Sequence, residues 1–227
     1  MANPRSSSAD LKSSIFFAGL DEAAIRTIFT AGKIRRMSAK RVITTGGHMA
    51  THFFLVQSGR VRYYHLTKNG RVVQVARLVA GDVIGLVTLL RSQSAYMAST
   101  ETVSDCELLV WERSAVRRFV SLYPVLGENG LRIVLGYLQR YIERHAGLVA
   151  NTAEERLAKT LLRLGQQSDE VYADGIEIHT TNDELSGLAD ISRFTASRLL
   201  SDWVRAGTVS KGRGRIRLHA PEALMID

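Results

Sequence analysis

Near the carboxyl end of the chain, one cluster of residues has the types that contact with a nucleic acid requires. Arg193, Ser197, Arg198 and Ser201 fall at the spacing of one helical face, with Phe194 among them. Arginine donates paired hydrogen bonds to guanine O6 and N7, serine binds phosphates or base edges, and an apolar ring contacts the thymine methyl group. Because an exposed phenylalanine gains nothing from water, this face favours a major-groove contact over a merely solvated surface.

The charge of the chain reverses sign in the same region. The net charge is +8 and the sequence pI is about 9.9. Between Ile191 and His219 seven lysines and arginines stand against one acid, whereas between Glu154 and Asp190 three stand against nine. A surface that gathers positive charge attracts polyanions. We therefore predict that these residues bind double-stranded DNA: Arg193, Phe194, Ser197, Arg198, Ser201, Lys211, Arg213 and Arg215.

Histidines and one cysteine are the other side chains that offer ligands for a cofactor. His48, His52, His65 and His145 are available as axial ligands of haem, although no spacing among them is diagnostic. The single Cys106 excludes a disulfide framework and an iron–sulfur cluster, and we expect its thiol to be a small buried group. The cofactor is therefore unknown, with haem left open, and we expect no other resident metal.

A helix-turn-helix followed by a hairpin is needed to position the cluster. Thr181 is predicted to cap the middle helix, with Glu184 completing a capping box, and Gly207 to end the last one. Helices are expected over residues 154–165, 183–189 and 192–206, and strands over 176–178 and, as a basic wing, 208–218. The apolar face of the last helix comprises Ala196, Leu199, Leu200, Trp203 and Val204.

A long apolar repeat precedes this domain and indicates a dimerisation helix over residues 124–152. Its apolar side chains step by four and three, as in the heptads of a coiled coil. A helix of this length beside a small β domain buries such a seam more readily against a second copy, and packing on its own domain is the alternative. The predicted seam consists of Leu131, Leu135, Leu138, Ile142, His145 and Val149, and the same steps continue to Thr152.

The first half of the chain has the pattern of an antiparallel β-roll of the cupin-like jelly-roll type. Glycines separate short segments rich in β-branched and aromatic residues, and Asn69-Gly70 between two of them is a strong hairpin signal. A short helix is expected over residues 21–29. Strands are expected over residues 52–57, 60–67, 71–79, 98–103 and 107–111.

Length and composition fit an α+β protein with three functional segments. The chain has 227 residues, of which 45% are hydrophobic, enough for a sizeable core. No window reaches the roughly 18 apolar residues of a membrane span. The first ten residues are polar and serine-rich, unlike a secretory signal, so we expect a soluble cytoplasmic protein that binds no membrane. The predicted segments are a β-roll sensor domain at 1–123, the dimerisation helix and hinge at 124–152, and the DNA-binding domain at 153–227.

A β-roll, a long helix and a winged helix-turn-helix in this order resemble the CRP/FNR family of bacterial transcription regulators. The roll matches at Gly59, at Gly81-Asp82 and at Gly85, and the DNA-binding domain matches over 156–162 and 191–198. The resemblance implies a non-enzymatic, sequence-specific regulator that binds a palindromic operator as a homodimer, responds to a signal in the roll, and has RNA polymerase as a partner.

The resemblance also assigns DNA-contact positions within the last helix. Arg193 and Arg198 fall on positions that contact DNA in the family, and Ser197 with Arg198 resembles the serine–arginine pair of the FNR branch. Phe194 stands where the family usually carries an acid that reads cytosine. The half-site of this chain is therefore expected to differ from the usual one.

The residues that hold cyclic AMP in the family are replaced here. Those relatives carry Gly-Glu and a later Arg-Ser, whereas this chain has Leu86 and Tyr96, with Tyr141 and Ile142 in place of a threonine–serine pair that meets adenine. Leu86 cannot accept a hydrogen bond, and Tyr96 is neutral where a phosphate needs a cation. We expect an unknown, uncharged or weakly polar effector instead of a cyclic nucleotide. Its predicted pocket is lined by Leu86, Val87, Thr88, Leu89, Tyr96, Leu138 and Tyr141.

Three other functions stay open at this point. A cupin-like metal-dependent enzyme would use His48 and His52, but no acid lies near them in the sequence and the basic carboxyl-terminal motif would have no role. A non-specific nucleic-acid binder would leave the roll unexplained. A constitutive DNA binder without an effector is consistent with every feature above.

Overall fold

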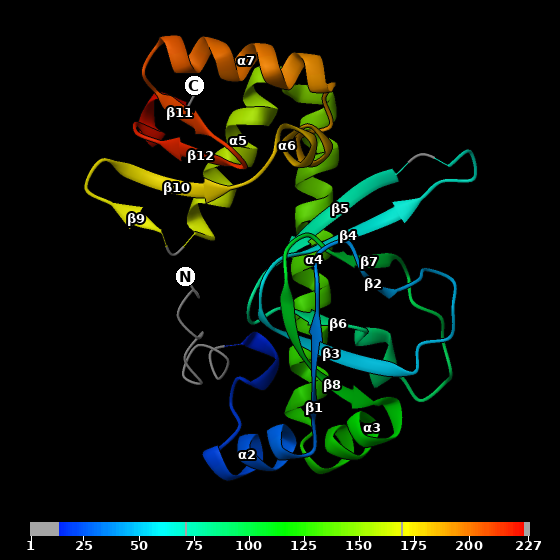
Figure 1. Cartoon of the computed structure of the whole chain (residues 1–227). Coiled ribbons are helices and arrows are strands. Elements are labelled where there is room, and N and C mark those ends of the chain that lie inside the picture. Colours follow the sequence, from blue (N-terminus) through cyan, green and yellow to red (C-terminus); the bar gives the residue numbers. More distant parts are fainter. Residues whose placement is uncertain (1–13, 71, 169, 225–227) are drawn as a thin grey trace. The chain divides into compact units, whose positions relative to one another are not determined.

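The computed structural model describes residues 14–70, 72–168 and 170–224, and the chain divides into two compact units (Figure 1). Unit 1 comprises residues 1–139 and unit 2 residues 140–227, so that their boundary falls inside the longest helix. The predictions made for the first ten residues and for Arg71, at the start of an expected strand, lie outside the described part.

Unit 1 is the predicted roll, built from two four-stranded antiparallel sheets. The strand orders are β1-β8-β3-β6 and β2-β7-β4-β5. Asn69-Gly70 joins β4 to β5 as predicted, and Gly70 has a φ of 78°, which suits glycine. The elements are η1 Ile15–Phe17, α2 Glu22–Thr30, β1 Lys33–Met37, β2 Val42–Thr44, β3 His52–Ser58, β4 Val61–Leu66, β5 Val72–Leu78, β6 Val83–Ile84, η2 Leu86–Leu89, β7 Ser99–Thr102, β8 Cys106–Glu112 and α3 Arg113–Leu122.

Sequence patterns did not predict β1, β2, β6 or α3. β1 pairs with β8 alone and lies at the edge of its sheet, where four of its five residues are exposed. An edge strand that carries charged side chains has neither an apolar run nor a clear alternation, so its pattern resembles that of a loop. β6 is two residues long and therefore below the length at which periodicity is visible.

A buried aromatic cluster joins the first sheet of the roll to η1, α2 and α3. Phe17, Phe53 and Trp111 are buried together, and the indole Nε1 of Trp111 donates to the carbonyl of Ile28 at 2.8 Å. Asn129, which is fully buried, donates from Nδ2 to the carbonyl of Phe16 within η1 at 3.1 Å and to that of Ala18, directly after η1, at 2.7 Å. These bonds tie the helix that carries Asn129, α4 (Val125–Ala150), to the roll.

Helix α4, Val125–Ala150, leaves its predicted seam in solvent. The exposed fraction is 59% for Leu131 and 86% for Val149. The expected continuation of the seam to Thr152 is wrong, because Thr152 begins the next helix. Its hydroxyl accepts from the Glu155 amide at 3.2 Å, and the Glu155 carboxylate accepts from the Thr152 amide at 2.7 Å, which is a complete capping box.

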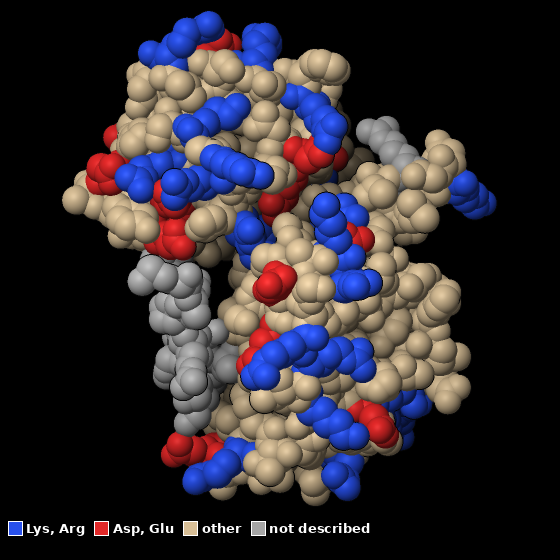
Figure 2. Space-filling view, in the orientation of Figure 1, with Lys and Arg blue, Asp and Glu red and all other residues tan. Residues whose placement is uncertain are grey.

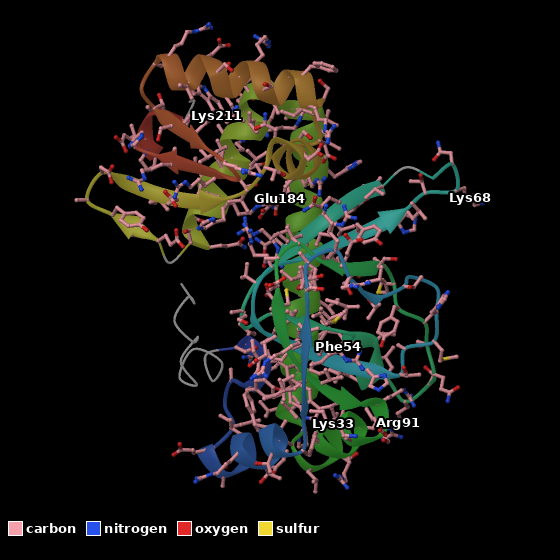
Figure 3. All side chains as sticks on the ribbon, in the orientation of Figure 1. Lys33, Phe54, Lys68, Arg91, Glu184 and Lys211 are labelled. Atoms are coloured by element: carbon pink, nitrogen blue, oxygen red, sulfur yellow. The ribbon has the colours of Figure 1, made fainter. Side chains whose placement is uncertain are left out.

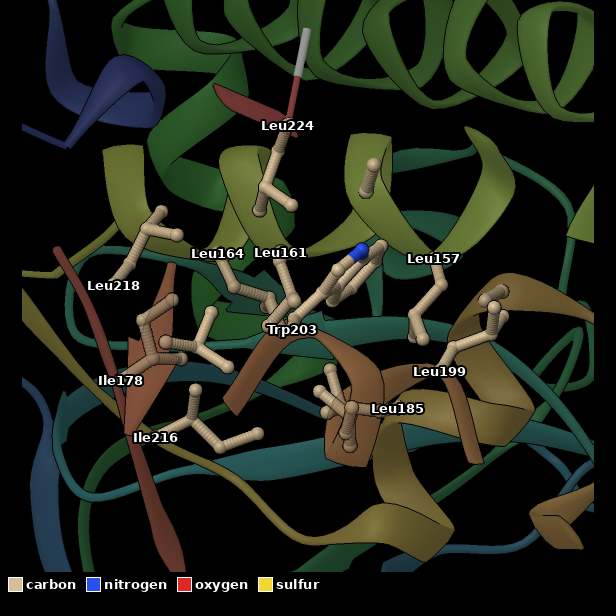
Figure 4. Packing of buried hydrophobic residues seen from close by; sticks show 14 of the residues in the cluster. Leu157, Leu161, Leu164, Ile178, Leu185, Leu199, Trp203, Ile216, Leu218 and Leu224 are labelled. Carbon is tan, nitrogen blue, oxygen red and sulfur yellow. The ribbon is translucent and has the colours of Figure 1, made fainter. Parts of the chain in front are cut away.

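Unit 2 contains the predicted winged helix-turn-helix. Its sheet has the order β11-β12-β10-β9, and three helices pack on it around buried leucines such as Leu157, Leu161 and Leu185 (Figure 4). The elements are α5 Ala153–Gln166, β9 Val171–Tyr172, β10 Gly175–His179, α6 Asn182–Ala189, α7 Arg193–Arg205, β11 Val209–Gly212, β12 Arg215–Leu218 and η3 Pro221–Leu224.

Two local predictions in this unit need correction. Thr181 caps α6 by accepting from the Glu184 amide at 3.2 Å, but the Glu184 carboxylate accepts from the hydroxyl of Thr180 instead, so the capping box is incomplete. Val204, assigned to the apolar face of α7, is 40% exposed. It lies at the edge of the stripe that Ala196 and Leu200 centre, where the core ends.

Candidate DNA interface and effector region

The turn between α6 and α7 sets the start of the recognition helix. Asp190 ends α6 with a φ of 52°, and the Ile191 amide donates to the Ser186 carbonyl at 3.1 Å. Ser192 caps α7, since its hydroxyl accepts from the Thr195 amide at 3.0 Å. The first turn of α7, which carries Arg193, is therefore presented in solvent with a fixed backbone.

The predicted DNA-contact residues of α7 lie on its exposed face, opposite the buried core residues. Phe194 is 89% exposed, and the side chains of Arg193 and Arg198 are each 68% exposed. Ser197 is half-buried and Ser201 exposed, with the Ser201 hydroxyl donating to the Ser197 carbonyl at 2.8 Å. An apolar ring that is this exposed is costly in water.

The two arginines have acidic partners that DNA can replace. Arg193 forms an ion pair with Asp183, and Nη1 of Arg198 lies 3.8 Å from Oδ2 of Asp202. Asp202 also pairs with Arg205. Exposed ion pairs of this kind contribute about 0–1 kcal/mol. Such pairs hold the two guanidinium groups only weakly at the surface.

The wing contains two kinds of basic residue. Lys211 and Arg213 lie at its exposed tip, whereas Arg215 Nη1 lies 3.2 Å from the carboxylate of Glu177, a side chain only 7% exposed. Arg217, which the sequence did not single out, contacts the same carboxylate at 3.0 Å. The wing and α7 carry much of the blue surface of this unit in Figure 2, and Lys211 is labelled in Figure 3.

Arg217 is held on three sides. Its guanidinium also lies 2.8 Å from Asp174 and stacks 4.8 Å over the ring of Tyr172. Hydrogen bonding from Arg217 lowers the pKa of both Glu177 and Asp174 from the ordinary carboxyl values. The cross-strand register of Glu177 opposite Arg217 produces this arrangement, and the alternation of Arg215 and Arg217 is the signal that could have found it.

In the roll, the two hydroxyl-bearing residues of the predicted effector pocket, Tyr96 and Thr88, form hydrogen bonds with backbone groups of the roll. The Tyr96 hydroxyl accepts from the His52 amide at 3.1 Å and donates to the His52 carbonyl at 2.9 Å, and Tyr96 is 9% exposed. Thr88 is fully buried and donates to the Gly85 carbonyl at 2.8 Å. Both hydroxyls are therefore engaged with backbone groups of the roll. Leu86 packs against the aromatic cluster, and none of the predicted effector residues carries a charge that could compensate a cyclic phosphate.

The residues of α4 that face the roll are not the ones predicted. Ile133 packs against the same buried cluster as Leu86 and Leu89, and Tyr137 packs against the same buried cluster as Val87. Leu138 and Tyr141, predicted to line the pocket, are 51% and 63% exposed. Ile133 and Tyr137 stand four residues apart and are offset from the seam, which is the spacing that could have identified a second apolar face.

The candidate haem ligands lie on separate elements, and none of the four is buried. His48 is in an exposed turn, His65 is exposed on β4, and His145 stacks on Tyr141 along α4. His52 is half-buried, lines a surface hollow of about 340 Å³ and bonds through Nδ1 with the Thr51 hydroxyl. Cys106 is buried as predicted, and burial raises the pKa of its thiol.

Two family models match the chain. The cyclic nucleotide-binding domain matches residues 34–123, and the Crp-like helix-turn-helix domain matches residues 155–225. A roll of the first kind joined to a winged helix of the second defines a class of transcriptional regulators that bind DNA. The chain belongs to this class, as a member of the CRP/FNR family.

Named relatives agree with this assignment along most of the chain. The anaerobic regulatory protein of Bacillus subtilis is 25% identical, over 97% of this chain and 90% of its own length. The cyclic AMP receptor protein of Thermus thermophilus is 27% identical, over 96% of this chain and 97% of its own length. FixK2 from Bradyrhizobium japonicum has the same fold, with a TM-score of 0.73 at 22% identity, over 85% of this chain and 95% of that one.

Within the described residues, no helix combines the length and the apolar character that crossing a bilayer requires.

Proposed function

We propose that this chain is a homodimer that binds a palindromic operator through α7 and the wing. The observation that carries the proposal is the exposed face of α7, where Phe194 is 89% exposed and the side chains of Arg193 and Arg198 on the same helix are each 68% exposed. An aromatic ring held in water on a basic helix has its best use in the major groove. Arg193, Phe194 and Arg198 read base edges, while Lys211 and Arg213 bind phosphates.

The exposed seam of α4 supports the dimer. Leu131, Leu135, Leu138 and Ile142 are each more than half exposed, and Val149 more so. A continuous apolar stripe of this length costs free energy in water unless a second copy covers it. Pairing two seams gives the symmetry of a palindrome, with the two recognition helices about 34 Å apart.

We further propose that the roll, residues 1–123, responds to a signal other than a cyclic nucleotide. Leu86 and the bonds of the Tyr96 hydroxyl to His52 support this, because neither leaves a charged partner for a cyclic phosphate. The segment 124–152 then serves as dimerisation helix and hinge, and 153–227 as the DNA-binding domain. The regulator acts in the cytoplasm, with RNA polymerase as its second macromolecular partner.

Haem is not part of this proposal, because none of the four candidate histidines is buried beside an apolar pocket. The absorbance spectrum of the purified protein checks this point. A Soret band at one haem per chain would contradict it.

Selection of binding sites from random double-stranded DNA tests the proposed function. We expect a two-fold symmetric consensus with one helical turn between the half-sites, and a thymine at the position that Phe194 contacts. Phe194→Glu should move the preference at that single position toward cytosine, and leave the remaining positions unchanged. A selection that yields no consensus would contradict sequence-specific binding.

A further inference from the structure

The turn of the helix-turn-helix carries an ion pair that the proposed DNA contacts do not use. Arg144, on the last part of α4, donates from Nε to Oδ2 of Asp190 at 2.5 Å and from Nη2 to Oδ1 at 2.8 Å. The same Nη2 group donates to the carbonyl of Gly187 at 2.9 Å. The two side chains are 20% and 28% exposed. A bidentate pair of this kind fixes the relative orientation of its two groups as well as stabilising them.

Asp190 is placed where its orientation determines that of the recognition helix. Its φ of 52° and ψ of 47° are left-handed, a conformation that aspartate and asparagine tolerate better than most residues. Ser192, two residues later, caps α7, and Arg193 opens it. A rotation at Asp190 therefore turns the first, base-reading turn of α7.

A second arginine also holds the end of α6. Arg156 of α5 donates to the carbonyls of Ala189 at 3.1 Å and of Asn151 at 2.8 Å, and lies 3.5 Å from that of Asp190. The carboxyl end of a helix presents unpaired carbonyls and partial negative charge, which cations satisfy. The end of α6 is thus held by α4 through Arg144 and by α5 through Arg156.

Nearby positive charge makes Asp190 the counterion that Arg144 needs. Burial, together with the charges of Arg144 and Arg140, lowers the pKa of Arg163 from its ordinary value. The cationic side chains in this part of unit 2 therefore repel one another. A carboxylate beside Arg144 offsets that repulsion and keeps its guanidinium directed at the turn.

We propose that Arg144 and Asp190 form a positioning clamp that fixes the recognition helix relative to α4, and thereby sets the distance between the two half-sites that the dimer can bind. The proposal rests on the proposed homodimer. One recognition helix can bind a single half-site in any orientation relative to α4. Two helices bind a palindrome together only when both are held at the matching distance, so the clamp contributes to the second contact.

The experiment compares two DNA duplexes, the selected palindrome and one half-site in scrambled flanks. Asp190→Asn keeps the shape and the left-handed backbone but loses the charge, and Arg144→Gln shortens the guanidinium to a neutral amide. Arg132→Ala, which removes the same charge from an exposed position of the same helix, is the control. We expect each clamp variant to bind the palindrome about tenfold more weakly and the half-site within about twofold of the wild type.

The double variant separates a clamp from two independent effects. If the residues act as one pair, the double variant loses no more affinity for the palindrome than either single variant. The sign of the Asp190→Asn effect is a second readout. Removing a negative charge near DNA should by itself strengthen binding, so weaker binding to the palindrome indicates lost positioning.

Three results would overturn the clamp: unchanged binding of the palindrome by both variants, equal weakening on both duplexes, or losses that multiply in the double variant. The helix content of each variant is checked by circular dichroism. If Arg144→Gln has less helix than the wild type, the conclusion is drawn from Asp190→Asn. A wild-type chain that does not prefer the palindrome to scrambled DNA would contradict the proposed function itself. A wild-type chain that prefers the palindrome, together with variants whose ratio of palindrome to half-site affinity is unchanged, would contradict the clamp alone.

Discussion

The basic side chains of unit 2 differ in what they can distinguish on DNA. Arg198 stands on the exposed face of α7, whereas Lys211 stands on the wing. A guanidinium can bond two acceptors of one guanine, but an ammonium group on a flexible stem neutralises any phosphate. In the proposed function, sequence information and general affinity therefore come from different residues.

Arg198→Ala should cost about 1–3 kcal/mol on the selected operator and relax the preference at one base position. Fluorescence anisotropy with a set of single-base operator variants measures both quantities. Ser210→Ala on the wing, away from the reading face, is a control that should retain the full base preference. Loss of affinity without any relaxed position would show that Arg198 does not read a base.

Lys211→Ala should weaken binding to all sequences alike and lower the slope of log affinity against log salt by about one. The same anisotropy titrations at several salt concentrations, with operator and scrambled DNA, check this result. A loss confined to the operator would contradict the assignment of Lys211 to a phosphate.

The stability of the wing hairpin depends on ionised carboxylates of the neighbouring strand β10 and the turn before it. The pKa of Glu177 and that of Asp174 are lowered, chiefly by hydrogen bonds from Arg217. A carboxyl whose folded pKa lies below its unfolded value of about 4 binds more protons when unfolded. The contribution of each carboxylate to the free energy of unfolding is therefore complete above the unfolded pKa, and it is lost as the pH falls through the folded pKa.

Acid should thus destabilise the wild-type domain more steeply than Glu177→Gln, which has no carboxyl to protonate at that position. Thermal unfolding followed by circular dichroism from about pH 6 to about pH 3, a range that includes the unfolded carboxyl pKa, compares the two slopes. Parallel slopes would mean that the ion pairs with Arg215 and Arg217 do not stabilise the hairpin.

The α4 seam is the element that the proposed homodimer requires. Leu138→Glu places a charge in the middle of the apolar stripe, where pairing would bury it without a partner. Light scattering should show monomers, and operator affinity should fall to the level of a single half-site. Leu122→Glu, an exposed leucine outside α4, is the matched control and should remain dimeric. A Leu138→Glu dimer would refute the seam.

Local sequence patterns predicted the helices and strands that have strong periodicity. The side-chain contacts that depend on strand register or on helix packing could not be predicted in this way. Turn chemistry at Asn69-Gly70 and the apolar face of α7 are local, so the sequence shows them. The partner of Arg217 depends on which residue of β10 lies opposite, and the contact of Tyr137 depends on how α4 packs against the roll. The seam on α4 was predicted to continue to Thr152 because the steps of four and three continue to that residue. The helix ends earlier, at Ala150, because Thr152 forms the capping box of the next helix.

For the whole molecule, the roll should not respond to cyclic nucleotides. A ligand that binds only the folded state at 100 times its dissociation constant adds about 2.7 kcal/mol to stability. Millimolar cyclic AMP or cyclic GMP should therefore leave the melting temperature and the operator affinity unchanged. Stabilisation of that size that disappears in Leu86→Ala would show that the region around Tyr96 opens to admit the nucleotide.

The proposed function is tested most directly by a titration of the intact protein against the selected palindrome and a scrambled duplex of the same composition, at one physiological salt concentration. We expect two chains per palindrome, and an affinity at least about 10³-fold higher than for the scrambled duplex. Equal affinity for the two duplexes, or one chain per palindrome at saturation, would contradict a sequence-specific homodimer.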